Sequence, residues 1–345
     1  MSIGNVSILF TCGGRRVALL EQFRRAMADL GITGRLIVTD ITPASSAFQA
    51  ADEGVIVPRA DAPDYLDSLE SIVVSRKVGL VVPLTDLDLL ILARHRERLQ
   101  RHGCVVMIGS KESVATCRNK SRTADFLEEC GLAGIRTQTL DAFGESPTFP
   151  CFVKPVGGSG SIGAGRIDSM AELEAHVKRH GRELIVQELV GGQEFTVDVY
   201  VSRSGAVRAI VPRLRLAVRA GEVEKGLTLR DPELIDAAER ICRGLPGLWG
   251  AFCCQCRRAL GEDGQPAGPA KFFEINPRFG GGMPLSIAAG ADLPRYLLED
   301  VLNMPTSDGR AEFTDRLLML RYDDAVFRPV EDIRSLPGFA SPSFR

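Results

Sequence analysis

Short apolar runs alternate with amphipathic segments along the first hundred or so residues. The apolar runs predict strands at 6–11, 36–40, 54–57, 80–83 and 105–108, and the amphipathic segments predict helices at 16–30, 65–77 and 87–102. Buried strands that alternate with helices indicate a parallel sheet covered on both faces. Ligands of such sheets bind beyond the carboxyl ends of the strands. The residues of this chain at those ends include Gly14, Arg15, Asp40 and Asp86.

The pattern changes after Gly109. A helix is expected over 113–130, and from Phe149 onward the apolar runs follow one another closely, with hairpin turns between them. Strands are expected at 151–156, 165–168, 184–189, 195–202, 207–211, 251–259, 271–275 and 317–322, and helices at 170–179, 231–244 and 285–302. This second part is therefore expected to be α+β with antiparallel hairpins.

Charge and cysteine content narrow the class of protein. The 42 basic and 44 acidic side chains give a net charge of −2, which argues against nucleic acid or an anionic membrane as a partner. No uncharged apolar stretch reaches the roughly 18 residues of a membrane span, and we expect no signal peptide. Nine scattered cysteines show no disulfide spacing, so we expect a cytoplasmic protein with reduced thiols. The four histidines lie in charged, helical-looking stretches, which argues against a histidine-based triad or zinc site.

A glycine-rich segment follows the expected strand that carries Lys154. It reads Gly157, Gly158, Ser159, Gly160, Ser161, Ile162, Gly163. Its G-x-G-x-x-G match is not a dinucleotide fingerprint, because a strand rather than a helix is expected after it. At a hairpin tip these residues offer backbone N–H groups and hydroxyls to phosphate oxygens, and Lys154 can reach the same phosphates. A surface hairpin without a ligand is the alternative interpretation.

Glu274 and Asn276 suggest a cation site. Two residues apart on a strand, their side chains project from the same face, and carboxylate and amide oxygens suit Mg²⁺. Gln255, on the preceding strand, can add a third oxygen, and Arg278 can clamp phosphoryl or carboxylate oxygens. A polar sheet edge is the alternative. The neighbouring Cys253 and Cys254 point to opposite faces, so they are expected to be buried rather than to bind zinc.

Two further segments are ambiguous on their own. Glu188 and Glu194 flank a Gly-Gly linker that follows an expected strand, an arrangement able to contact a nucleoside. Arg219 belongs to a run of alternating arginines, with Lys225 close behind it. That run either faces a cleft and binds an anionic substrate or forms a solvated strand face.

Taken together, these blocks resemble the ATP-grasp superfamily, specifically its carbamoyl-phosphate-synthase-like carboxylate–amine ligases. The matching order is a helix with Lys120, then Lys154-Pro155 with its glycine loop, then Gln187-Glu188 with Glu194, then the segment Glu274 to Arg278. The resemblance covers nearly the whole chain. It implies a Rossmann-like pre-ATP-grasp domain at 1–112, a small subdomain with the glycine loop at 113–186, a large subdomain with the metal site at 187–327 and a tail at 328–345.

The resemblance also implies roles for individual residues. ATP would be bound by Lys120, Lys154, Gly158, Ser159, Gly160, Ser161, Glu188, Leu189 and Glu194. Gln255, Glu274 and Asn276 would hold Mg²⁺, with two ions expected and Mn²⁺ as a substitute, although the first of these positions is acidic in the commonest pattern. Arg278, Arg219 and Lys225 would act on the reacting groups.

The activity implied is that of an ADP-forming ligase, which activates a carboxylate as an acylphosphate and couples it to an amine. Its partners would be these small molecules, and a homo-oligomer is left open. Two alternatives remain: a carbamoyl-phosphate or carboxyphosphate type of synthase, and an ATP-binding regulatory protein without turnover.

Overall fold

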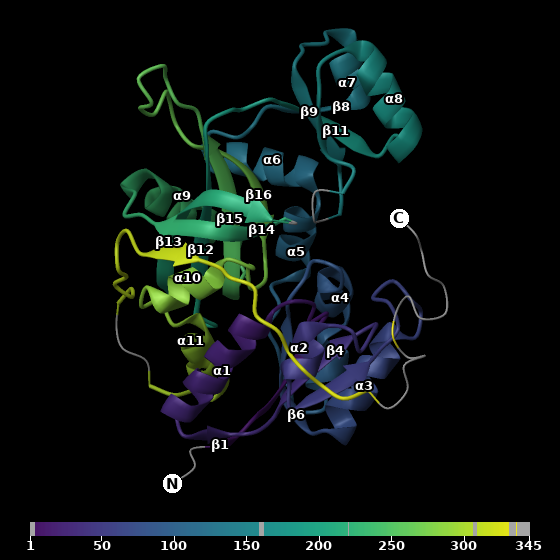
Figure 1. Ribbon diagram of the computed structural model, residues 1–345, viewed down its shortest axis with the longest axis vertical. Coiled ribbons are helices and arrows are strands. Elements are labelled where there is room, and N and C mark those ends of the chain that lie inside the picture. Colours follow the sequence, from purple (N-terminus) through teal and green to yellow (C-terminus); the bar gives the residue numbers. More distant parts are fainter. Residues whose placement is uncertain (1–3, 159–161, 220, 306–308, 331–335, 337–345) are drawn as a thin grey trace.

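The N-terminal part of the chain forms a five-stranded parallel sheet, as its pattern predicts (Figure 1). The computed structural model describes residues 4–158, 162–219, 221–305, 309–330 and 336. The strand order is β5-β4-β2-β6-β7, from Glu53–Ile56, Leu36–Asp40, Ser7–Thr11, Val78–Pro83 and Val105–Val106. Beside this sheet, the short strands β1 (Gly4–Asn5) and β3 (Ile32–Thr33) pair with each other.

Both faces of this sheet are buried, which explains its continuous apolar strands. Ile8 and Phe10 of β2 pack in one core with α1 (Val17–Asp29), while Leu9 between them packs in another with α3 (Tyr65–Ser75) and α4 (Leu89–Gln100). The short α2 (Ser46–Ala50) follows β4. No helix in the described ranges is long and apolar enough to cross a membrane.

The large sheet is six-stranded and antiparallel, in the order β16-β15-β12-β13-β14-β17. Its strands are Lys271–Asn276, Gly250–Arg258, Gln193–Val201, Val207–Arg219, Glu222–Thr228 and Leu318–Leu320. One face packs on α5 (Lys111–Arg118), α6 (Lys120–Glu129) and α9 (Pro232–Gly244). The other face packs on α1, α10 (Met283–Ala288) and α11 (Leu293–Val301).

The small sheet projects from the rest of the molecule and has a core of its own (Figure 1). Its order is β10-β9-β11-β8, from Gly165–Ile167, Cys151–Pro155, Leu184–Glu188 and Thr137–Thr139. The helices α7 (Leu140–Glu145) and α8 (Met170–His180) cover it. The β9–β10 hairpin carries the glycine loop, as the sequence predicts.

The strands β1, β3, β8 and β14 and the helices α2 and α7 were not predicted from the sequence, and three predicted elements differ from the expectations. The helix expected over 113–130 breaks at Asn119 into α5 and α6, and both pack on the large sheet although the expected boundary grouped them with the small one. The helix expected over 285–302 is divided into α10 and α11 around Gly290, whose φ of +115° is incompatible with a helix. The strand β13 continues to Arg219 instead of ending at 211, because it pairs with β14 along that length.

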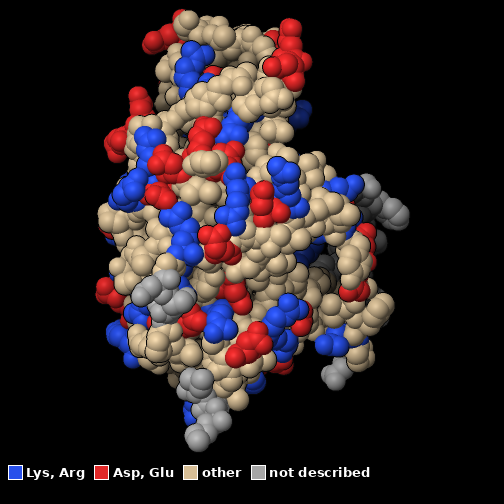
Figure 2. Space-filling model, turned by 90° about the vertical axis from the view of Figure 1, so that its left-hand side faces the viewer, with Lys and Arg blue, Asp and Glu red and all other residues tan. Residues whose placement is uncertain are grey.

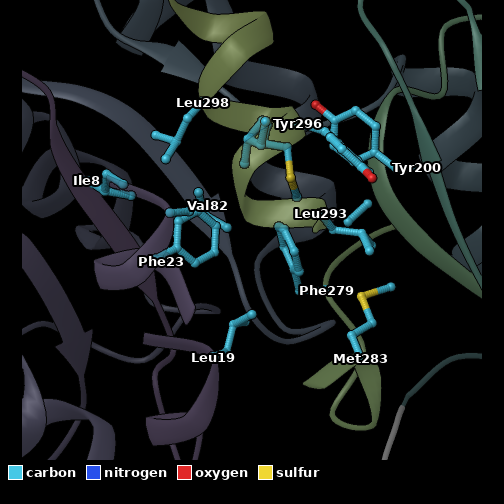
Figure 3. Packing of buried hydrophobic residues seen from close by; sticks show 14 of the residues in the cluster. Ile8, Leu19, Phe23, Val82, Tyr200, Phe279, Met283, Leu293, Tyr296 and Leu298 are labelled. Atoms are coloured by element: carbon cyan, nitrogen blue, oxygen red, sulfur yellow. The ribbon is translucent and has the colours of Figure 1, made fainter. Parts of the chain in front are cut away.

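The N-terminal domain and the large sheet share one hydrophobic core (Figure 3). Phe23 of α1 lies edge-on to Phe10 at 4.9 Å and to Phe279 at 5.4 Å between ring centroids. Tyr200 of the large sheet and Tyr296 of α11 form a similar pair at 5.6 Å. These rings join strands and helices from both parts of the chain, so the two parts are held in a fixed relation to each other.

The surface carries charges of both signs. Figure 2 shows Lys and Arg side chains interspersed with Asp and Glu side chains over the face that it presents. After β17 the chain runs as an extended segment from the large sheet to the N-terminal domain (Figure 1), where Arg328 Nε donates to the Gln49 carbonyl at 3.2 Å.

Candidate active site

A cavity of about 500 Å³ lies between the small sheet and the large sheet. Its first wall comes from β9 and β11, with Lys154 and Glu188 among its residues, and its second from the cleft-facing side chains of β12, β13, β15 and β16. Most of the residues expected in the site line it. These are Lys120, Lys154, Gly158, Glu188, Leu189, Glu194, Gln255, Glu274 and Arg278.

The three expected metal ligands lie together on the large sheet. Gln255 on β15 is the direct cross-strand partner of Glu274 on β16, so their side chains share a face. Asn276, two residues further on, is buried and its Nδ2 donates to Glu274 Oε1 at 2.9 Å. Its Oδ1 accepts from Arg278 Nη2 at 3.3 Å, and Asn276 is not among the residues that line the cavity, unlike Gln255 and Glu274. One carboxylate and two amides form a set of side chains that suits a hard cation.

Two lysines face these ligands from other elements. Lys154 on β9 is buried, with its Nζ 5.1 Å from the Phe273 ring centroid. Burial lowers the pKa of Lys154 to about 8, with Glu274 raising it and Lys120 lowering it further. The pKa of Lys120 is also lowered, chiefly by burial. Burial disfavours the charged form of both lysines, and only one carboxylate lies opposite them. The cavity is therefore suited to a polyanion, which would stabilise both ammonium groups.

The glycine loop lies against the junction of α5 and α6. Lys120, the first residue of α6, points its Nζ at the carbonyl oxygens of Gly157 and Gly158, at 3.4 and 3.3 Å. Gly158 has a φ of +93°, which a side chain would strain. The expected contacts Ser159, Gly160 and Ser161 lie outside the described residues.

Glu188 lies at the end of the cavity where the nucleoside is expected, and other residues of the protein hold its side chain. Glu188 Oε1 accepts from Lys271 Nζ at 2.7 Å and from the Arg136 backbone N–H at 2.9 Å. Its Oε1 is therefore already paired within the protein, and its backbone N–H donates to the Arg136 carbonyl at 3.1 Å. Leu189, just after β11, is partly exposed in the same wall.

Glu194 has two partners that the sequence did not reveal. Arg215 lies 2.8 Å and Arg257 2.5 Å from its carboxylate, and both arginines line the cavity. Arg257 is the cross-strand partner of Glu194, a relation that appears only once strand pairing is known. These two arginines are additional cations facing the site.

Arg219 and Lys225, expected to act on the reacting groups, are not brought to this cavity. Arg219 is half exposed and pairs with Asp323 at 2.5 Å and Glu224 at 3.4 Å. It lines a second cavity, of about 510 Å³, and Lys225 lines neither. The cause lies in β13: the register with β14 shifts on either side of Ala217, so the alternation of the arginines breaks after Arg215.

Arg278 connects the metal strand to the N-terminal domain. Its Nη2 donates to Asp86 Oδ2 at 2.8 Å and to Asn276 Oδ1 at 3.3 Å. Burial opposes the charge on Asp86, but Arg278 and Arg118 outweigh it and lower the pKa of that carboxyl overall. Asp86 therefore remains ionised at the floor of the cavity. Its place after β6 agrees with the expectation that strand ends face a ligand.

The fold and parts of the sequence have counterparts among known proteins. Three family models match: "PylC-like, N-terminal domain" over residues 8–107, "D-ala D-ala ligase C-terminus" over 126–215, and "ATP-grasp in the biosynthetic pathway with Ter operon" over 180–322. Among solved structures, N5-carboxyaminoimidazole synthetase from Staphylococcus aureus superposes with a TM-score of 0.67 at 14% identity, covering 89% of this chain and 80% of that one. L-amino acid ligase from Bacillus licheniformis gives 0.64 at 20%, covering 86% and 74%.

Two further proteins are similar to this chain in sequence. Formate-dependent phosphoribosylglycinamide formyltransferase from Bacteroides fragilis is 27% identical over 248 residues, which are 62% of this chain and 59% of that protein. D-alanine–D-alanine ligase from Mycobacterium leprae is 34% identical over 99 residues, 28% and 26% of the two chains. The chain thus spans less than two thirds of the length of either relative. Residues 180–322 thus match an ATP-grasp family model, and the chain as a whole shares its fold with these solved structures.

Proposed function

We propose that this protein is an ATP-dependent, ADP-forming ligase that activates a substrate carboxylate as an acylphosphate and couples it to an amine. One observation carries the proposal: Lys154 from the small sheet and Glu274 from the large sheet line the same cavity, with Gln255 and Arg278 beside them. Relatives and neighbours named as D-alanine–D-alanine ligase and L-amino acid ligase support it.

The cavity residues suggest how ATP binds. Lys120 and Lys154 would contact the phosphates under the glycine loop, and the backbone around Glu188 and Leu189 would contact adenine. Glu194 would accept from the ribose hydroxyls while Arg215 and Arg257 hold it in place. Gln255, Glu274 and Asn276 would hold Mg²⁺, which supplies charge neutralisation on the phosphates. Two such ions, with Mn²⁺ as a substitute, are part of the proposal.

The chemistry needs positioning and charge neutralisation more than acid–base groups. A carboxylate oxygen forms a bond to the γ-phosphorus of ATP, and the bond from that phosphorus to the bridging oxygen breaks to release ADP. The amine nitrogen then bonds to the acyl carbon, phosphate leaves, and the amine proton passes to solvent. Arg278, which lines the cavity, would neutralise the transferring group, and the glycine loop would exclude water from the acylphosphate.

We also propose a cytoplasmic location and small-molecule substrates. All nine cysteines are free thiols, which suits a reducing compartment. A homo-oligomer is compatible with this proposal.

Acylphosphate trapping tests the function. The protein is incubated with ATP, MgCl₂ and pools of carboxylic and amino acids, with hydroxylamine as the trapping amine. We expect carboxylate-dependent ADP release together with formation of the hydroxamate, whose sum with any amide product equals the ADP. ADP release that depends only on bicarbonate would instead indicate a carboxyphosphate type of synthase. Tight ATP binding without ADP release would indicate a regulatory protein, and either result overturns the ligase.

A further inference from the structure

Guanidinium groups from four separate elements gather where the N-terminal domain meets the large sheet. Arg16 precedes α1, Arg118 ends α5, Arg278 follows β16 and Arg321 follows β17. We call these four residues the arginine cluster. Two carboxylates lie among these arginines. One of them, Asp86, is 2.8 Å from Arg278 and 3.3 Å from Arg118. The other, Glu222, lies 3.2 Å from both Arg16 and Arg321.

The charges of the arginine cluster do not balance. Four guanidinium groups face two carboxylates, which leaves an excess of two positive charges in a poorly solvated place. The side chains of Arg16, Arg118 and Arg278 are only 13, 14 and 13% exposed. Within the described residues, the buried Nε of Arg278 has no hydrogen-bond acceptor, and the buried Nη1 of Arg16 has only its ion pair with Glu222 at 3.2 Å. Of the four arginines, Arg278 lines the cavity, and its unpaired donor is costly unless a ligand or water binds there.

Arg16 occupies its position at a local cost. It is the N-cap residue of α1, whose first turn contains no acidic residue, so its charge opposes the helix dipole. Burial is the main cause that lowers its pKa, and the neighbouring Arg278 and Arg321 lower it further. Gly281 makes the approach possible, because a Cβ there would lie 2.2 Å from Arg16 Nη1. A buried cation at a helix N-terminus is energetically unfavourable, and unfavourable placements of this kind are expected at functional sites.

We propose that the acyl substrate carries a second anionic group and that Arg16, together with Arg118 and Arg278, binds it beside Asp86. This inference rests on the proposed ligase function and names its substrate class: an acid with two anionic groups, the second being a carboxylate or a phosphate. The triphosphate already has Lys120, Lys154 and the metal ligands, so the excess charge of the arginine cluster is available to the acid. One carboxylate of the acid is activated as the acylphosphate, and the arginines bind its second anionic group.

Calorimetric titration tests this with the site for ATP filled. Mg²⁺ and the non-hydrolysable analogue AMP-PNP are added first, and the protein is titrated with succinate, glutarate, 2-phosphoglycolate and 3-phosphonopropionate. Propionate and butyrate are the monoanionic controls. We expect at least one dianion to bind about tenfold or more tightly than the monoanions. The dicarboxylate and phosphate probes distinguish the two sources of charge. Dianions that bind no better than butyrate overturn the proposal.

Variants assign the binding to Arg16. Arg16→Gln is expected to weaken dianion binding about tenfold or more while AMP-PNP affinity stays unchanged, and Arg16→Lys to restore part of it. Arg25→Gln is the matched control, an exposed arginine on the same helix. Gly281→Ala keeps every charge but displaces Arg16, and is expected to behave like Arg16→Gln. Weakened AMP-PNP binding with unaltered dianion binding would place Arg16 in the phosphate site and overturn the proposal.

The hydroxamate assay separates failure of this inference from failure of the ligase function. If no carboxylate gives ADP and hydroxamate, the proposed function is wrong. If monoanionic acids react as fast as dianionic ones and Arg16→Gln leaves their KM unchanged, the ligase stands and the second anionic group is wrong.

Discussion

The surroundings of Lys154 in the free protein favour the binding of an anion. Its ammonium is buried beside a second lysine, and Glu274 compensates only partly, so its pKa falls to about 8. A phosphate chain entering the cavity would supply the missing negative charge and stabilise the protonated form. The cost of burying this lysine in the free protein is thus recovered when a polyanion binds.

This pKa predicts how nucleotide binding depends on pH. Above pH 8 the free protein loses the ammonium, so the affinity for Mg²⁺-AMP-PNP should fall about tenfold by pH 9. Because the unfolded value of 10.5 is higher, the folding stability should rise as the pH increases from about 8 to 10.5. Titration calorimetry from pH 7 to 9.5 measures the first effect. Lys154→Arg stays charged and should bind without this dependence; a wild-type affinity that is flat to pH 9.5 refutes the assignment.

Glu274 supplies the second prediction at this scale. Glu274→Gln keeps the size and the cross-strand position but removes the only carboxylate among the three expected ligands. Turnover should fall by about 10²–10³, the range typical for the loss of one group that stabilises developing charge. The thermal midpoint should change little. Activity close to that of the wild type at saturating Mg²⁺ would remove Glu274 from the metal site.

At the scale of elements, Asn119 decides where Lys120 lies. Its side chain accepts from the backbone N–H groups of Ser121 and Arg122, at 3.1 Å each, and so caps α6. The Lys120 N–H donates to the Val156 carbonyl, which ties this helix start to the strand of the glycine loop. The break between α5 and α6 therefore aims an ammonium at the loop.

Removing this cap should affect stability and nucleotide binding together. Asn119→Ala is expected to lower the free energy of unfolding by about 1 kcal/mol, the usual value of a lost N-cap. It should also raise the KM for ATP, because Lys120 loses its fixed start. Urea denaturation and steady-state kinetics measure the two effects. Asn119→Asp retains an acceptor and should keep both near wild type, whereas equal effects from both variants would contradict the capping role.

The sequence predicted the five strands of the N-terminal sheet and most strands of the other two, although not β8 or β14. It also predicted the opposite placement of Cys253 and Cys254, which the two separate cores confirm. It could do so because burial and alternation are local properties of the chain. It did not predict the break at Asn119, whose signal is only a capping side chain inside a helical pattern. The sequence also predicted that Arg219 and Lys225 act at the cleft. The structure places them elsewhere because the register of β13 with β14 shifts at Ala217, and the alternation of residues along the chain does not reveal that shift. Arg257 was missed because only strand pairing brings it to Glu194.

At the scale of the whole molecule, the shared core keeps the two sides of the arginine cluster in place. Phe23 of α1 contacts Phe279, the residue after Arg278, and thereby links the N-terminal domain to the loop that follows the metal strand. The small sheet does not take part in this core. The molecule therefore consists of one base with a shared core and one smaller unit, with its own core, that carries the glycine loop.

Two matched phenylalanine variants test this division. Phe23 and Phe143 are both buried, and each lies edge-on to another phenylalanine. Phe23→Ala should lower the free energy of unfolding of the base by about 3–5 kcal/mol. Phe143→Ala should raise hydrogen exchange in the small sheet while the base stays protected. Exchange measured by mass spectrometry distinguishes them, and identical exchange patterns in both variants would show that the division does not exist.

The most direct measurement is a crystal structure of the protein with Mg²⁺ and AMP-PNP. We predict that phosphate oxygens lie within about 3 Å of Lys154 Nζ. The cation should lie between those phosphates and Glu274, with the adenine against the backbone near Leu189. A nucleotide bound at another surface, with neither Lys154 nor Glu274 in contact with it or its metal ion, would contradict the account.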